Sequence, residues 1–284
     1  MSGIVTVHGV GNHAPGQPPD QVARHRAREW AKALGSGLGV DLGDLNVTFA
    51  YWAPILHAGV PIAQGSGPDP DAALDYLERV DSDTVNLAAA WLEALELPTV
   101  TAQGRLAMPL RHAVSMAARR FSLDGRLTKL FVAGCFPEVA GYLTYDPVRI
   151  AVRDYVARVI AEQSARIVIA HSLGTVVAFE ALHAHPELTL DLLITLGSPL
   201  ALPHGVFHRL QPRPVDGLGI RPPTVTRWVN VADHGDPVAI LRPFDRYFPD
   251  VDLDLVESVG LFEFHKVGKY LSSASVAATL QPYL

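Results

Sequence analysis

Short runs of apolar, mostly β-branched residues alternate with longer helical patterns along this chain, and that alternation restricts the folds that the chain can adopt. Residues 4–7 (IVTV), 166–170 (RIVIA), 190–196 (LDLLITL) and 225–231 (VTRWVNV) have the pattern of strands, and a glycine follows each run within a few residues. Strands that alternate with helices form a parallel sheet with helices on both faces. The sequence therefore predicts an α/β fold with a mostly parallel sheet. The other predicted elements are strands at 45–52 and 250–256 and helices at 20–38, 147–163, 173–185 and 266–282.

The alternation stops between residues 54 and 145, where successive helical patterns occur, the last two at about 105–121 and 126–143. We predict one domain over residues 1–284, with a core at 1–53 and 146–284 and a helical cap inserted at 54–145. An insertion over the carboxyl ends of the strands shapes the substrate pocket in such folds. Five large apolar side chains of the insertion either line that pocket or pack the cap onto the core: Trp91, Leu92, Leu95, Phe131 and Phe136.

Composition narrows the class of protein. The chain has 284 residues, of which 49% are hydrophobic and 18% charged, and its net charge is −6 without a long basic run, so we expect no nucleic-acid partner. The single cysteine, Cys135, excludes an intrachain disulfide. We find neither a signal-peptide pattern nor an apolar run of about 18 residues that could span a bilayer. A soluble, cytoplasmic protein without a transmembrane segment is expected, and the oligomeric state is left open.

The segment 169–174 (IAHSLG) joins a predicted buried strand directly to a helix. A serine at such a junction is held in a tight, strained turn that exposes its hydroxyl above the sheet, which is the nucleophile-elbow motif. The residues two before and two after the serine must be small, as Ala170 and Gly174 are, although glycine is more usual at the first position. The following helix directs its amides and positive dipole end toward Ser172. We predict that Ser172 is a nucleophile; the alternative is a serine that caps an ordinary helix.

A second motif, His8-Gly9-Val10-Gly11, follows the first predicted strand. Acyl transfer at a serine needs two backbone N–H donors for the developing oxyanion, one from the residue after the nucleophile and one from a nearby loop. We predict Leu173 as the first donor and Val10 as the second, since the flanking glycines let the peptide turn inward. A phosphate-binding loop is the alternative, but the glycine spacing does not match one. His8, Gly9 and His171 are expected to border the substrate, with His8 orienting or packing rather than acting as a base.

The base and the acid are identified from their order along the chain. The sequence has twelve histidines, so the presence of a histidine near another motif does not by itself identify the base. With a serine elbow of this type, the acid follows a late strand and the histidine follows the last one. This order makes His265 the general base. Two aspartates compete for the acid: Asp236 in a Gly-Asp-Pro turn, which we favour, and Asp233 at the strand end, where it could instead cap the turn.

Four segments together resemble the α/β-hydrolases: VTVHGVG at 5–11, VIAHSLG at 168–174, GDPVA at 235–239 and HKVGKYL at 265–271. More narrowly, they are similar to bacterial serine esterases and lipases with a His-Gly-x-Gly oxyanion loop and an Ala-x-Ser-x-Gly elbow. The resemblance covers about 1–53 and 146–284 and implies an α/β-hydrolase fold with a helical lid. It also implies a triad of Ser172, Asp236 and His265. The chain departs from the family by beginning at the strand that carries the oxyanion loop and by its long insertion.

The resemblance implies hydrolysis of a carboxylic ester through an acyl-enzyme on Ser172, but it does not identify the substrate. The apolar side chains of the insertion favour a small-molecule substrate with a hydrophobic acyl group. Thioester cleavage, amide or peptide hydrolysis and acyl transfer or cyclisation would use the same residues, so the sequence does not choose among them. A non-catalytic binding protein of the same fold is a third hypothesis. The chemistry requires no cofactor and no metal, and we predict neither.

Overall fold

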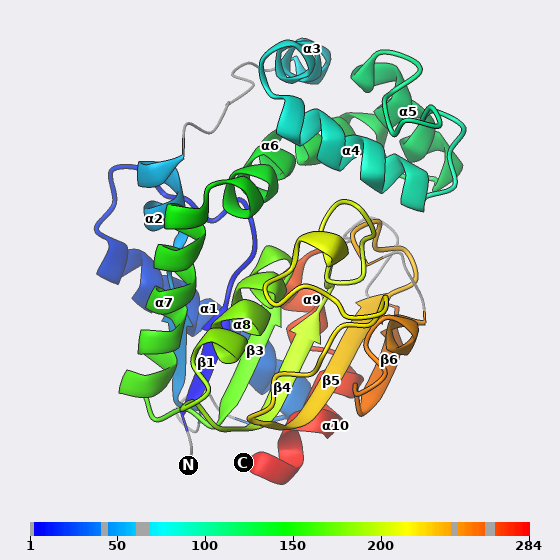
Figure 1. Cartoon of the computed structure of the whole chain (residues 1–284). Coiled ribbons are helices and arrows are strands. Elements are labelled where there is room, and N and C mark those ends of the chain that lie inside the picture. Colours follow the sequence, from blue (N-terminus) through cyan, green and yellow to red (C-terminus); the bar gives the residue numbers. More distant parts are fainter. Residues whose placement is uncertain (1–2, 41–44, 61–68, 240–242, 259–264) are drawn as a thin grey trace.

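The computed structural model describes residues 3–40, 45–60, 69–239, 243–258 and 265–284, and within them the chain forms an α/β fold. Six parallel strands make one sheet in the order β2-β1-β3-β4-β5-β6 (Figure 1). The predicted parallel sheet flanked by helices is therefore confirmed. The strands are β1 (Ile4–Val7), β2 (Val47–Ala50), β3 (Ile167–His171), β4 (Leu190–Leu196), β5 (Val225–Asp233) and β6 (Leu253–Glu257).

Two hydrophobic cores lie on opposite faces of this sheet. Because successive side chains of a strand point to opposite faces, Ile4 packs in one core and its neighbour Val5 in the other. The first core is covered by α1 (Pro19–Leu38), α9 (Val267–Leu271) and α10 (Ala274–Leu280). The second is covered by α7 (Asp146–Glu162) and α8 (Leu173–Ala184), which lie side by side in front of the strands in Figure 1. Burial on both faces explains why the central strands are continuous apolar runs.

The segment between β2 and α7, where the sequence predicts a helical insertion, contains the following helices in the described residues: α2 (Ala53–Gly59), α3 (Pro70–Val80), α4 (Ser82–Ala94), α5 (Leu110–Arg120) and α6 (Gly125–Thr144). Aspartates at positions 69, 81 and 124 accept backbone N–H groups at the starts of α3, α4 and α6, so polar capping residues set where these helices begin. Helices α3 to α6 lie above the carboxyl ends of the strands in Figure 1. The Trp91 indole N–H donates to the Pro237 carbonyl at 2.7 Å, which ties α4 to the loop after β5.

Two predicted helices differ from the structure. The helix expected at 266–282 is divided into α9 and α10, because the hydroxyl of Ser273 accepts the Val276 N–H and begins a new helix. The helix expected from about residue 105 begins at Leu110 instead, after Pro109, while Val100 and Leu106 pair in an antiparallel bridge. In both cases a local capping residue or proline determined the boundary, whereas apolar spacing predicted a longer helix.

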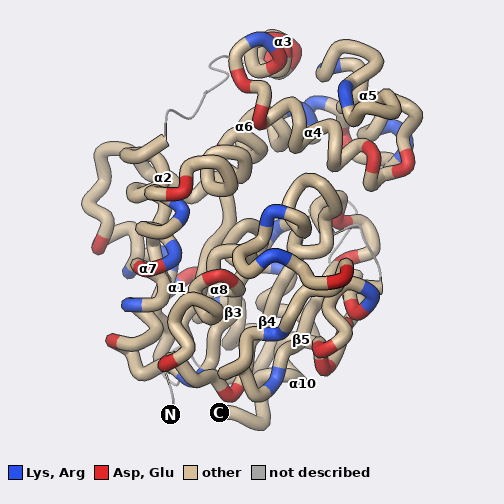
Figure 2. The backbone as a smooth tube through the Cα atoms, in the orientation of Figure 1, with Lys and Arg blue, Asp and Glu red and all other residues tan. Residues whose placement is uncertain are grey.

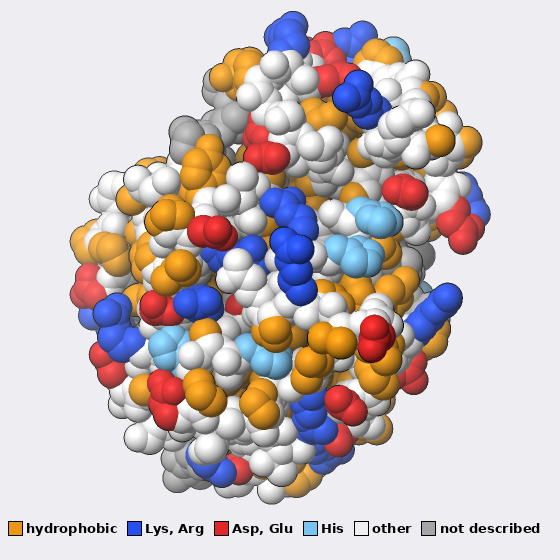
Figure 3. All heavy atoms as spheres, in the orientation of Figure 1, with side chains coloured by type: hydrophobic (Ala, Val, Ile, Leu, Met, Phe, Trp, Pro, Cys, Tyr) orange, Lys and Arg blue, Asp and Glu red, His pale blue; other side chains and the backbone are white. Residues whose placement is uncertain are grey.

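Lys and Arg residues alternate with Asp and Glu residues along the backbone of both the sheet region and the helices above it (Figure 2). In the face shown in Figure 3, the helices above the sheet form a smaller lobe on the larger body, with hydrophobic and charged groups interspersed. Among the described residues, no helix combines the length and the hydrophobicity needed to cross a bilayer.

Candidate active site

Ser172 occupies the turn between β3 and α8 in a backbone conformation that a non-glycine residue seldom adopts, with φ 54° and ψ −131°. Such a conformation costs on the order of 1–3 kcal/mol and persists where the surrounding structure enforces it. Here the strand before Ser172 and the helix after it do so, and the Ser172 N–H donates to the Leu196 carbonyl at 3.0 Å. The serine therefore has the strained geometry that its sequence context predicts for an elbow.

The elbow is in close contact with the loop that follows β1. A Cβ on Gly174 would lie 2.4 Å from the carbonyl oxygens of both Val7 and His8, and a Cβ on Gly9 would lie 2.5 Å from Ser172 Cβ. Only glycine avoids these clashes, since real Cβ atoms do not approach other heavy atoms so closely. Gly174 and Gly9 thus let the loop that carries Val10 lie directly against the serine.

The structure brings Ser172, His265 and Asp236 into one hydrogen-bonded row. His265 Nε2 lies 2.7 Å from Ser172 Oγ, and His265 Nδ1 lies 2.9 Å from Asp236 Oδ2. The imidazole is 7% exposed and the carboxylate is fully buried, so solvent screens their interaction little. With Nδ1–H donated to Asp236, the Nε2 lone pair faces the serine hydroxyl. This is the arrangement that a general base for Ser172 requires.

Further hydrogen bonds hold Asp236 ionised. Burial by itself would raise the pKa of Asp236, but the charge and hydrogen bond of His265, with bonds from the Val238 amide and the Tyr270 hydroxyl, lower it to about 2. The Val238 N–H donates at 2.9 Å and the Tyr270 O–H at 2.8 Å. A carboxylate that accepts several hydrogen bonds keeps its charge near neutral pH, so Asp236 can stabilise an imidazolium at His265.

Asp233, the competing acid, lies at the end of β5 and accepts the Gly235 N–H, as expected for a residue that caps the turn. Its backbone N–H donates to the Tyr270 hydroxyl at 2.9 Å, so the phenol bridges the two aspartates. Tyr270 is buried in α9, and sequence reasoning did not identify it as part of the site. No local sequence pattern around Tyr270 indicates that it contacts Asp236, which lies 34 residues earlier in the chain.

The two predicted oxyanion donors lie beside the serine. Val10, Ser172 and Leu173 line the same pocket. Within the described part of the chain, neither the Val10 N–H nor the Leu173 N–H donates to a protein acceptor. Leu173 is the first residue of α8, whose first amides have no partner within the helix. Both groups are thus available to an external oxyanion.

Of the residues expected to border the substrate, Gly9 lies against Ser172, while the two histidines are enclosed by protein. His8 is fully buried and stacks on Trp52 with ring centroids 4.4 Å apart. Its Nε2 accepts the Trp52 N–H at 3.2 Å. His171 is 7% exposed and lies against the imidazole of His265 at 4.6 Å. Burial lowers the pKa of His8 to about 3 and that of His171 well below its usual range, so both rings are neutral.

The buried, neutral His8 predicts a pH dependence of folding. The unfolded chain binds a proton at His8 below about pH 6.5, whereas the folded chain does not until about pH 3. Stability must therefore fall as the pH drops through this window, by about 1.4 kcal/mol per pH unit for one such group. Since His8→Gln keeps one donor and one acceptor without a proton to titrate, we expect a shallower loss of stability between pH 6.5 and 4 in urea denaturation.

The control for this experiment is His25→Gln, which alters an exposed histidine of α1. We expect this variant to follow the wild-type pH dependence. Equal slopes for wild type and His8→Gln would show that the buried imidazole does not titrate with unfolding.

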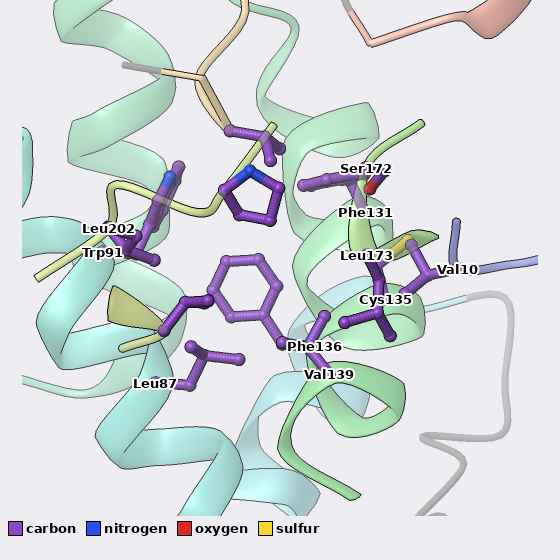
Figure 4. A pocket seen from close by; sticks show the side chains of 13 residues that line it. Val10, Leu87, Trp91, Phe131, Cys135, Phe136, Val139, Ser172, Leu173 and Leu202 are labelled. Carbon is purple, nitrogen blue, oxygen red and sulfur yellow. The ribbon is translucent and has the colours of Figure 1, made fainter. Parts of the chain in front are cut away.

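The pocket next to Ser172 is apolar and narrow, with a volume of about 420 Å³ including its open mouth. Figure 4 shows Leu87, Trp91 and Leu202 on one side of it and Val10 and Leu173 on the other. Of the five apolar residues predicted to line a pocket or to pack the cap, Trp91, Phe131 and Phe136 line it. Leu92 and Leu95 are buried elsewhere in the helical segment. The full lining is Val10, Leu87, Trp91, Phe131, Cys135, Phe136, Val139, Ser172, Leu173, Pro199, Leu202, Val206 and Val238.

Comparison of the chain with protein families, with curated proteins and with solved structures found no match. The geometry of this site is therefore the basis on which a function can be inferred. Among the described residues, no cluster of three or more histidine, cysteine, aspartate or glutamate side chains is arranged to hold a metal ion.

Proposed function

We propose that this chain is a serine hydrolase of the α/β-hydrolase fold that cleaves carboxylic esters through an acyl-enzyme. The observation that carries the proposal is the continuous row of hydrogen bonds from Asp236 through His265 to Ser172, which ends at an apolar pocket. A serine capping a helix would need neither partner. The strained backbone at Ser172 and the two available amides support the same conclusion.

The proposed reaction has two halves. His265 Nε2 takes the Ser172 proton as Oγ forms a bond to the acyl carbon, and the carbonyl oxygen becomes an oxyanion that accepts the Val10 and Leu173 N–H groups. When the tetrahedral intermediate breaks its bond to the alcohol oxygen, His265 returns the proton to the leaving alkoxide. Water then attacks the acyl-enzyme with His265 again as base. The acid is released and the proton returns to Ser172.

We propose that helices α3 to α6 act as a cap over the acyl site. Phe131 and Phe136 of α6 and Trp91 of α4 enclose the side of the pocket that faces away from the sheet. Phe131 also contacts His265, with ring centroids 5.6 Å apart. An apolar enclosure next to the nucleophile favours a hydrophobic acyl group, because burial of each CH₂ contributes about 0.8 kcal/mol.

A graded set of p-nitrophenyl esters tests this function. We expect kcat/KM to rise by up to about fourfold per added CH₂, following the transfer free energy of a methylene group, until the acyl chain fills the pocket. A matched ester with a charged acyl end, such as a succinate monoester, is the control and should be hydrolysed more slowly. The absence of turnover over the whole set would contradict the proposal. Faster turnover of acyl thioesters than of matched oxyesters would replace esterase by thioesterase.

A further inference from the structure

Glu138 is a buried carboxylate that the proposed reaction does not use. It lies in the middle of α6, next to Pro137, and its side chain is 7% exposed. Burying a carboxylate is costly unless hydrogen bonds satisfy its oxygens. The partners of Glu138 therefore indicate what this residue stabilises.

Each carboxylate oxygen of Glu138 has a partner outside α6. Oε2 accepts the Gly11 backbone N–H at 3.1 Å, and Oε1 lies 3.3 Å from Nε2 of His57 in α2. The His57 ring stacks on His13 with centroids 3.8 Å apart. The Glu138 side chain of α6 thus reaches the loop after β1 and holds it by a hydrogen bond to the Gly11 amide.

The atoms that Glu138 holds are next to the proposed oxyanion donor. Gly11 N–H belongs to the same peptide group as the Val10 carbonyl, and that carbonyl accepts Asn12 Nδ2–H at 3.1 Å. The preceding peptide group contains the Val10 N–H, and its Gly9 carbonyl accepts Asn12 Nδ2 at 3.1 Å and lies 2.7 Å from His8 Nδ1. Both peptide groups beside Val10 are therefore anchored through their other polar atoms, while the Val10 N–H donates to no acceptor among the described residues.

We propose that Glu138 is a positioning residue that sets the direction of the Val10 N–H by holding the Gly11 amide. This inference rests on the proposed function, because it assigns Glu138 a role in stabilising the oxyanion of that reaction. The same helix lines the acyl pocket through Phe131, Phe136 and Val139. Helix α6 consequently couples enclosure of the acyl group to alignment of the oxyanion hole.

Two substitutions separate reach from charge. Glu138→Gln keeps the length of the side chain and an oxygen that accepts the Gly11 N–H, but it removes the charge. Glu138→Asp keeps the charge, but its side chain is one methylene shorter. From the same backbone position in α6, its carboxylate cannot reach the Gly11 N–H. Removal of an oxyanion donor costs roughly 10²–10³ in kcat, and a misaligned one costs less. We therefore expect kcat of Glu138→Asp to fall roughly 10- to 100-fold with KM nearly unchanged, and Glu138→Gln to stay within about fivefold of wild type.

Binding of a trifluoromethyl ketone with the preferred acyl chain gives a second readout. This compound forms a tetrahedral adduct with the serine, so its inhibition constant depends on the oxyanion hole. We expect it to weaken in Glu138→Asp by the same factor as kcat/KM. The matched control is Glu78→Asp, since Glu78 also accepts a backbone amide, that of Leu110, at 3.1 Å within the helical segment. This control should leave kcat and inhibition unchanged.

The outcomes distinguish this inference from the proposed function. If wild type hydrolyses no ester and does not bind the ketone, the proposed function itself is wrong. If wild type is active and Glu138→Asp has the wild-type kcat and inhibition constant, only the role of Glu138 is overturned. The role is likewise overturned if Glu138→Gln loses activity while Glu138→Asp keeps it. The activity would then depend on the charge of residue 138 and not on the length of its side chain. Thermal unfolding of each variant identifies any that fails to fold. If Glu138→Asp does not fold, a loss of activity or of ketone binding in folded Glu138→Gln overturns the proposed role by itself.

Discussion

Replacing Ser172 by alanine is expected to lower kcat for ester hydrolysis by about 10⁶-fold, the scale on which loss of a serine nucleophile acts in enzymes of this mechanism. The alanine variant has no Oγ to form the acyl-enzyme, while His265 and Asp236 keep their own hydrogen bond. Its fold should be unchanged, because Ser172 Oγ has its hydrogen-bond partner in His265 rather than in the core. Steady-state rates on the preferred ester, with circular dichroism as the check on folding, measure this effect.

The matched control is Ser198→Ala. Ser198 is also a buried serine, 4% exposed, and its hydroxyl pairs with Thr175 at 2.8 Å. We expect this variant to keep most of the wild-type activity. Comparable rates for Ser172→Ala and wild type would contradict the assignment of the nucleophile.

The second large effect concerns the acid. Asp236→Ala is expected to lose about 10⁴-fold in kcat, as triad aspartates do when they are removed. His265 would lose the acceptor that fixes its Nδ1–H and stabilises its charged form. Asp233→Ala removes another buried carboxylate, at the end of β5, and that carboxylate accepts the Gly235 N–H and caps the turn. It should retain activity within about tenfold, because Asp236 and its hydrogen bond to His265 remain in this variant.

These two aspartate variants form a direct comparison, because they lie three residues apart and both are buried. Initial rates at one pH and one saturating ester concentration suffice. An inactive Asp233→Ala together with an active Asp236→Ala would reverse the assignment of the acid.

The sequence predicted the parts of the site that depend on local pattern and on chain order. The strand before Ser172 was recognisable as an apolar run, and a helix was expected to begin directly after the serine; the structure contains both. The position of Asp236 after a late strand and of His265 after the last one predicts both as partners of Ser172, and the structure brings the three residues together. Their roles in catalysis are predictions that the variants above test.

Other features depend on contacts between distant parts of the chain, which no local pattern encodes. Glu138 meets Gly11 across 127 positions, and Tyr270 meets Asp236 across 34. In the sequence, Glu138 is one of several polar residues of α6, and Tyr270 is one aromatic residue of the short helix α9. His171 was expected at the substrate, but its ring lies against His265 and Tyr270. Side-chain direction at a strained turn is set by tertiary packing, so sequence could not supply it.

The central claim is that Ser172 is an activated nucleophile, and labelling with a fluorophosphonate tests it most directly. We expect the probe to phosphonylate wild-type protein at the peptide that contains Ser172, as read by mass spectrometry of the digest. Ser172→Ala should give no adduct and His265→Ala should react far more slowly. If wild type does not react under conditions in which a control serine hydrolase is fully labelled, or if the adduct forms at another serine, Ser172 is not the nucleophile.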